Sequence, residues 1–144
     1  MAPFDRILLC YDATPQGRRA LTCGAALSKA LHCETHLLAL MDCSHWTRGF
    51  DILATVDYRV EEDSAKEILL EAVEEMEHRG IEVTGHFRTG DPLLCIPELA
   101  ESVRADLIVI GHRRCGAFAR WWNGENHAVL LDRLSCGVLF QVSE

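Results

Sequence analysis

The chain is poor in the features that mark membrane-spanning, secreted and catalytic proteins. Its longest apolar runs, such as 107–110, have the length of a strand and fall far short of a bilayer span. The first residues lack the basic-then-apolar layout of a signal peptide. No Gly-x-Ser-x-Gly motif occurs, and no serine, cysteine or carboxylate has a recognisable base beside it. We therefore expect a cytoplasmic protein that is not an enzyme and has no membrane partner.

Basic side chains are also scarce. Against 22 Asp and Glu there are 14 Lys and Arg, which gives a formal net charge of −8 over 144 residues. A surface for nucleic acid needs clustered positive charge, so nucleic acid is excluded as a general partner. The 7 cysteines are odd in number and contain no Cys-x-x-Cys, which favours reduced thiols that pack as small hydrophobes. Cys115, beside Arg114, is the best placed for a lowered pKa, but an ordinary loop cysteine is the favoured interpretation.

Several soft metal ligands gather between the first expected helix and the loop after the second strand. A zinc site needs tighter, paired spacing to bring four ligands together tetrahedrally. We therefore predict no metal site and interpret these side chains as structural or surface residues. The group consists of His32, Cys33, His36, Cys43 and His45.

Apolar strand patterns and amphipathic helical patterns alternate along the chain. The run 7–11 is continuous rather than alternating, which is typical of a strand buried on both faces of a parallel sheet. Gly80 ends a helix, Asp91 and Pro92 open another, and Pro97 predicts a kink in it or a later start. The pattern predicts one α/β domain, 1–144, a three-layer α/β/α sandwich around a five-stranded parallel sheet. The expected strands are 7–11, 35–41, 81–87, 107–110 and 137–142, the expected helices are 15–31, 61–79, one from 92 and 126–134, and 42–56 is expected to be irregular.

Five segments together resemble the universal stress protein family over essentially the whole chain. The resemblance implies a Rossmann-like, HUP-type sheet in the strand order 3-2-1-4-5, and dimerisation, which many members show. With the final strand at a sheet edge in that order, the unpaired backbone of 137–142 predicts a homodimer. The segments are 7–12, 37–42, 89–92, 105–112 and 135–139.

The loop after 107–110 carries part of the family's phosphate motif. Nucleotide-binding members have Gly-x-x-Gly, nine residues, then Gly and Ser or Thr, so that bare amides and a hydroxyl approach the phosphates. Gly111 and Gly124 match at the proper separation, but Arg114 replaces the second glycine and Glu125 replaces the hydroxyl residue. The resemblance also implies that Asp12 and the backbone of Leu40 hold the adenosine.

These substitutions leave two interpretations of the motif. A carboxylate about 5 Å from a phosphate charge costs roughly 3 kcal/mol at an effective dielectric near 20. Glu125, followed by Asn126 in the first turn of its helix, would occupy the helix's anion position and pair with Arg113 or Arg114 as an internal phosphate mimic. Alternatively, Glu125 is a solvated acid and the arginines lie on the surface.

The predicted function is that of a stress-response regulatory or protective binding protein with weak or absent ATP binding. No cofactor is required, and ATP or AMP is the candidate ligand. The alternative is an ATP- or AMP-binding switch that uses the arginines in place of the glycine. A slow ATPase is a third alternative, which would need bound metal and a positioned water, and the sequence offers no dedicated ligands for either.

Overall fold

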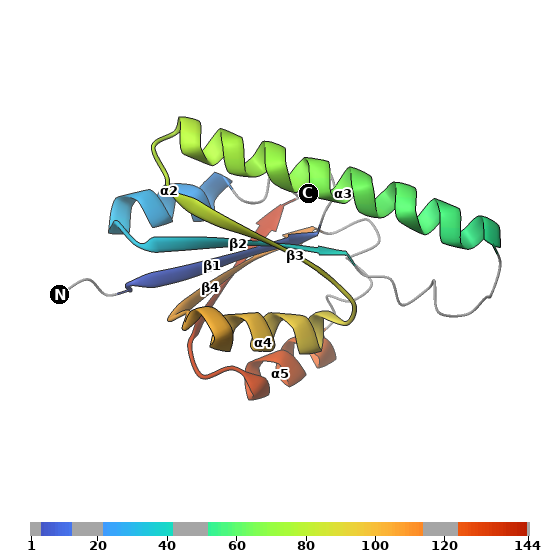
Figure 1. Ribbon diagram of the computed structural model, residues 1–144. Helices are drawn as coiled ribbons and strands as arrows, with labels where there is room; N and C mark the ends of the chain where they lie inside the picture. The colour runs from blue at the N-terminus through green and yellow to red at the C-terminus, as the bar shows by residue number, and fades with distance from the viewer. Residues whose placement is uncertain (1–3, 13–21, 42–51, 114–123, 144) are drawn as a thin grey trace.

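Parallel strands form the centre of the computed structural model, which describes residues 4–12, 22–41, 52–113 and 124–143 (Figure 1). In this part of the chain the sheet has five strands in the order β3-β2-β1-β4-β5, which confirms the order that the family resemblance implied. The strands are β1 (Arg6–Asp12), β2 (Glu34–Met41), β3 (Val83–Thr89), β4 (Leu107–Arg113) and β5 (Gly137–Ser143). The helices are α2 (Thr22–Leu31), α3 (Ile52–His78), α4 (Pro92–Val103) and α5 (Gly124–Arg133).

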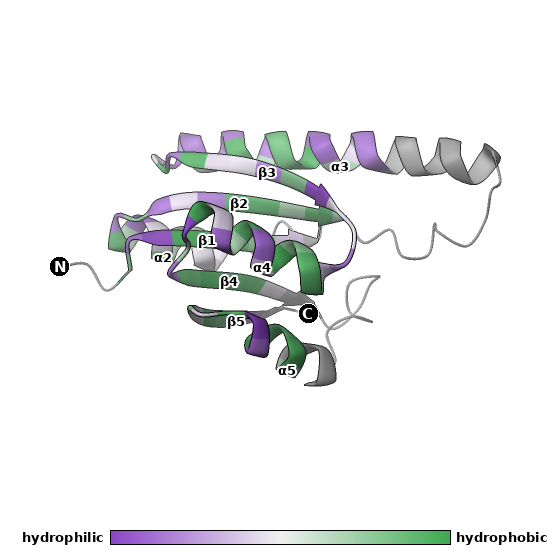
Figure 2. Cartoon of the chain, turned by 60° about the horizontal axis from the view of Figure 1, so that its bottom comes forward, coloured by the Kyte–Doolittle hydropathy of each residue, from purple (hydrophilic) through white to green (hydrophobic). Residues whose placement is uncertain are grey.

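The helices cover both faces of the sheet and bury its central strands. Alternate side chains of β1 and β2, such as Leu9 and Leu37, pack with α3, and the intervening ones, such as Leu38, pack with α4 and α5. Figure 2 shows the resulting contrast between apolar central strands and helices with one polar face. Burial on both faces explains why the sequence of β1 and β2 is continuously apolar. No described helix combines the length and apolar character that a membrane span requires.

The two helix boundaries predicted from glycine and proline are confirmed. Gly80 has a φ of 81° and ends α3, where its N–H bonds to Glu77 O at 2.9 Å and the N–H of Ile81 bonds to Met76 O at 3.0 Å. Asp91 caps α4 by accepting a bond from Leu93 N at 2.9 Å, with Pro92 at the first position. The later start considered for α4 is wrong, because the helix begins at Pro92 and continues through Pro97.

Other boundaries differ from the prediction. Strand β4 continues to Arg113 instead of ending at 110, and α5 starts at Gly124 instead of 126. Residues 52–56, expected to be irregular, already belong to α3. The segment 52–60 contains neither glycine nor proline, so nothing in it prevents the helix from starting early. The third strand begins at Val83 instead of 81, because the N–H of Ile81 is committed to the end of α3.

The carboxylate of Asp106, which directly precedes β4, is hydrogen-bonded to the backbone at the start of β1. Asp106 accepts hydrogen bonds from Asp5 N at 2.8 Å and from Arg6 N at 3.1 Å, and its own N–H bonds to Arg6 O at 3.0 Å. Further along, Cys10 pairs in register with Ile110. These hydrogen bonds, which we call the Asp106 clasp, align β1 with β4, so the two strands end together at the opposite edge of the sheet.

Candidate functional site

The carboxyl ends of β1 and β4 lie at the point where the sheet changes direction of winding. From β1 the chain continues to β2 on one side, whereas β4 lies on the other side. Asp12 is the last residue of β1. Gly111 lies two residues before the end of β4 and pairs in register with Gln141 of β5. In open α/β sheets, ligands bind beyond the strand ends at such a switch point. The topology therefore places Asp12 and Gly111 at the edge of the sheet where the sequence predicted a ligand crevice.

Leu40 lies next to Asp12 across the sheet. The two residues are paired in register, and Leu40 is paired with Arg88 on its other side. Its side chain is only 1% exposed and packs in the cluster with Ile96. Any contact of Leu40 with a ligand must therefore come from its main chain, as the resemblance implied.

Helix α5 directs its amino end at the same crevice. The helix starts at Gly124, and the chain after it enters β5 from the far edge of the sheet, so the start of α5 lies at the carboxyl edge (Figure 1). Leu130, 0% exposed, fixes α5 against Ile108 and Ile110 of β4. Glu125 and Asn126 thus occupy the first turn, where unpaired N–H groups and the helix dipole favour an anion.

Part of the predicted site lies outside the described residues. This applies to Arg114, and to the side chains of Asp12, Arg113, Glu125 and Asn126, whose backbone alone is described. Cys115, Cys43 and His45 also fall outside. The pairing of Glu125 with an arginine therefore stays a prediction, while the backbone brings Asp12, Leu40, Gly111 and Gly124 to one edge.

The model of the universal stress protein family matches residues 3–140. The chain belongs to this family. Comparison with curated proteins gives no match. Among solved structures, UspA from Lactobacillus plantarum is similar at 18% identity, covering 98% of this chain and 99% of that one, with a TM-score of 0.76.

Two further similar structures contain adenine nucleotides. A universal stress protein in complex with cAMP is 18% identical, covers 95% of both chains and has a TM-score of 0.65. The universal stress protein from Archaeoglobus fulgidus in complex with dAMP is 19% identical, covers 97% of this chain and 98% of that one, and has a TM-score of 0.59. At these identities the likeness establishes the shared fold.

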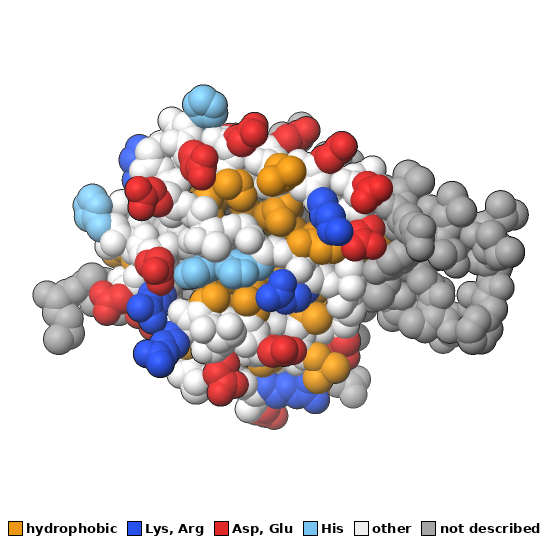
Figure 3. All heavy atoms as spheres, in the orientation of Figure 1, with side chains coloured by type: hydrophobic (Ala, Val, Ile, Leu, Met, Phe, Trp, Pro, Cys, Tyr) orange, Lys and Arg blue, Asp and Glu red, His pale blue; other side chains and the backbone are white. Residues whose placement is uncertain are grey.

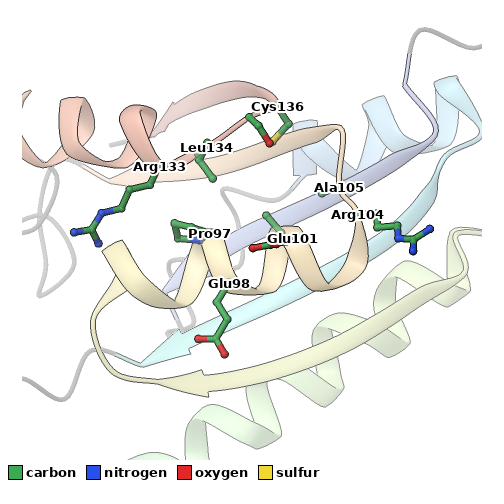
Figure 4. Close-up of a pocket in the computed structure, with 10 residues that line it drawn as sticks. Pro97, Glu98, Glu101, Arg104, Ala105, Arg133, Leu134 and Cys136 are labelled. Atoms are coloured by element: carbon green, nitrogen blue, oxygen red, sulfur yellow. The ribbon is translucent and has the colours of Figure 1, made fainter.

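A groove lies between α4 and α5, outside the predicted site. Ala105 and Cys136, which precede β4 and β5, line it at the amino edge of the sheet. Figure 4 shows the side chains of Glu98 and Arg104 pointing away from the groove. The charged groups of Glu98 and Arg104 therefore do not converge on one point in the groove, as they would to fix a bound ligand.

Three thiols in the described part of the chain, those of Cys10, Cys33 and Cys136, have raised pKa values. Burial raises the pKa of Cys10, and Cys136 adds to the rise. The pKa of Cys136 is raised by burial and then by Asp106, and the same two causes raise that of Cys33. Because the thiolate is the nucleophile, raised pKa values do not favour these three cysteines as reactive thiols at neutral pH.

The expected group of soft ligands does not stay together in the described residues. The Cys33 thiol donates to Phe4 O at 3.0 Å, whereas His36 contacts His86 of the neighbouring strand, with Nδ1 and Nε2 3.0 Å apart. Nowhere in the described ranges do three or more His, Cys, Asp or Glu side chains meet in a way that would hold a metal. No local sequence pattern connects His86 with His36, because the two residues are 50 positions apart.

Proposed function

We propose that this chain is a cytoplasmic stress-response protein that regulates or protects by binding, with weak or absent affinity for ATP and no catalytic role. Family membership supports the stress-response assignment. One observation carries the statement on ATP: Glu125 lies in the first turn of α5, where nucleotide-binding members have Ser or Thr. A carboxylate in that turn repels a phosphate and itself takes the favourable end of the helix dipole.

The magnitude of this repulsion decides against tight ATP binding. At about 5 Å and an effective dielectric near 20, each carboxylate–phosphate pair costs roughly 3 kcal/mol, which is more than a hundredfold in affinity. Arg113 and Arg114 offset part of that cost if they reach the phosphates. If one of them pairs with Glu125 instead, the charge of that arginine and the charge of Glu125 cancel without a ligand.

The second candidate is a switch that binds AMP or ATP. Two similar proteins are known in complex with cAMP and dAMP, each of which carries a single phosphate. The adenosine side of the crevice keeps Asp12 in register with Leu40. A monophosphate meets less repulsion from Glu125 than a triphosphate, so this candidate favours AMP over ATP.

Calorimetric titration with ATP and with AMP distinguishes the two functions. We expect the unmodified chain to give no ATP binding at micromolar concentrations, and the double variant Arg114→Gly, Glu125→Ser to gain it. Arg104→Gly with Glu98→Ser makes the same change of residue types on α4 and serves as the control. Micromolar ATP binding by the unmodified chain would contradict the proposal, and micromolar AMP binding alone would favour the switch.

We also propose a homodimer formed through β5. Within the described sheet this strand is an edge that pairs only with β4. Its Leu139 is 40% exposed, an apolar side chain beside an unpaired backbone. Light scattering after size-exclusion chromatography should give twice the chain mass of 16.1 kDa. A monomer at micromolar concentration would contradict the proposal, and Leu139→Lys should shift a dimer toward monomer.

A further inference from the structure

Two histidines on neighbouring strands meet on the face of the sheet that carries α4, at a place that α4 leaves uncovered. His36 lies in β2 and His86 in the edge strand β3, where His86 pairs in register with Leu38. His36 Nδ1 and His86 Nε2 are 3.0 Å apart, and the ring centroids are 5.2 Å apart. Figure 3 shows adjoining histidine side chains at the surface of this face. Both rings are partly buried, so the sheet holds them in place.

The neighbour of His36 on its other side sets which nitrogen carries the proton. Glu34 Oε2 lies 3.4 Å from His36 Nε2 and 2.9 Å from Arg6 Nε. If the carboxylate accepts the Nε2 proton, the lone pair of His36 lies on Nδ1 and faces His86. Metal-binding histidines have the same arrangement, with one nitrogen held by a carboxylate and the other directed at the ion.

The surroundings of His86 disfavour its charged form. Burial lowers the pKa of His86, and His36 and Arg88 lower it further. Arg88 itself donates to the main-chain oxygen of Phe87 at 2.8 Å. Among the described residues, Glu34 contacts His36, Arg6 contacts Glu34, and the charge of Arg88 acts on His86. Metal binding requires neutral imidazole rings.

The distance between the two nitrogens suits a shared metal ion. Zinc–nitrogen bonds of about 2.0–2.1 Å at a tetrahedral angle put two ligand nitrogens about 3.3 Å apart. The 3.0 Å contact between His36 Nδ1 and His86 Nε2 is a hydrogen bond, so metal binding would replace it, separate the two nitrogens by a few tenths of an ångström and turn both rings toward the ion. On binding, the proton on His86 Nε2 would move to its own Nδ1 through solvent, so the ring stays neutral.

We propose that His36 and His86 form a two-histidine site for a divalent transition metal of the nickel, copper and zinc class, with water completing the coordination. Imidazole nitrogens suit these ions, and Glu34 acts as the positioning carboxylate for His36. The site lies on β2 and β3, away from the ends of β1 and β4, and is independent of the nucleotide question.

Titration of the untagged, chelator-treated chain with Ni²⁺ tests the site. Ni²⁺ binds imidazole and competes less for thiolates than Zn²⁺ does, so binding at cysteines interferes less. We expect one calorimetric binding event that His36→Gln and His86→Gln each weaken at least tenfold. His78→Gln, which changes an exposed histidine at the end of α3, should leave it unchanged. Glu34→Gln should weaken binding about tenfold, the lower end of the effect of a positioning carboxylate.

Two outcomes would overturn the proposal. One is that the unmodified chain does not bind Ni²⁺ at a metal concentration of about 100 µM, at which a site of micromolar affinity would be occupied. The other is binding that His36→Gln and His86→Gln both leave intact, which would put the ion elsewhere. Circular dichroism of both variants checks that they fold, as expected for side chains at the surface.

Discussion

Arg133 donates a hydrogen bond from Nη1 to the main-chain oxygen of Leu93 at 2.9 Å. In a regular helix that oxygen would accept from the N–H of residue 97, but Pro97 has none. A side chain at the end of α5 thus supplies the donor that α4 lacks. The bond also joins the two helices on this face of the sheet, and it gives Pro97 a tolerated place inside α4.

The bond predicts a coupling between Arg133 and Pro97. Arg133→Ala should lower the free energy of unfolding by about 1 kcal/mol, because the bond is exposed. In a Pro97→Ala background the new N–H serves Leu93, so Arg133→Ala should cost much less. Urea denaturation of both single variants and the double variant measures this. Equal losses in the two backgrounds would refute the coupling.

Asp106 should matter for stability more than other acidic residues do. Asp106→Ala removes both bonds to the backbone of Asp5 and Arg6, and we expect a loss of about 1–3 kcal/mol in the free energy of unfolding. Asp132→Ala, at an exposed position of α5, is the control and should change stability by less than about 0.5 kcal/mol. Denaturant titrations compare the two, and a loss no larger than that of the control would argue against the clasp.

Gly24 allows α2 to lie close to the sheet. A Cβ at this position would come within 3.0 Å of Leu9 Cδ2 and 3.1 Å of Val109 Cγ1. Gly24→Val should therefore destabilise the fold by about 1–3 kcal/mol through overpacking. Ala26→Val, at an exposed position of the same helix, carries the same β-branched side chain without the contact. Thermal unfolding of both should show a clear drop only for Gly24→Val.

The lowered pKa of His86 makes stability depend on pH. Below the ordinary histidine pKa of about 6.5, the unfolded chain takes up a proton that the folded chain resists. The contribution of His86 to stability should therefore fall as the pH drops from about 6.5 toward the pKa of His86 in the folded chain. Above a pH of about 6.5 this contribution should stay constant. His86→Gln should reduce this slope, and His78→Gln should not. Identical pH profiles for the unmodified chain and His86→Gln would disprove the contribution.

The extent to which the sequence predicted the structure depends on the range of the interactions involved. Gly80 and Asp91 end and begin helices through bonds to residues within five positions, so local patterns sufficed. The buried strands followed from their continuous apolar runs, and the strand order from the family resemblance. The meeting of His36 with His86 depends on the pairing of β2 with β3, which no local pattern contains.

The sequence predicted a candidate site made of loops that follow the strands of a parallel sheet. The sheet shows that these strands end at the same edge. Asp12 and Leu40 are neighbours because β1 and β2 pair in parallel, which the apolar runs favoured. What Glu125 contacts could not be predicted, since a first-turn acid is equally suited to solvent and to an arginine. That choice depends on the path of the loop before α5.

The clasp at Asp106 has a practical consequence for binding experiments. It holds Asp5 at the amino edge of the sheet, so chain added ahead of Phe4 emerges on the side opposite Asp12 and Gly111. The last described residue of β5, Ser143, instead lies at the carboxyl edge, in register with Arg113. An immobilisation tag attached ahead of Phe4 should therefore leave the candidate site at Asp12 and Gly111 accessible to an added nucleotide, whereas one after Ser143 would crowd it.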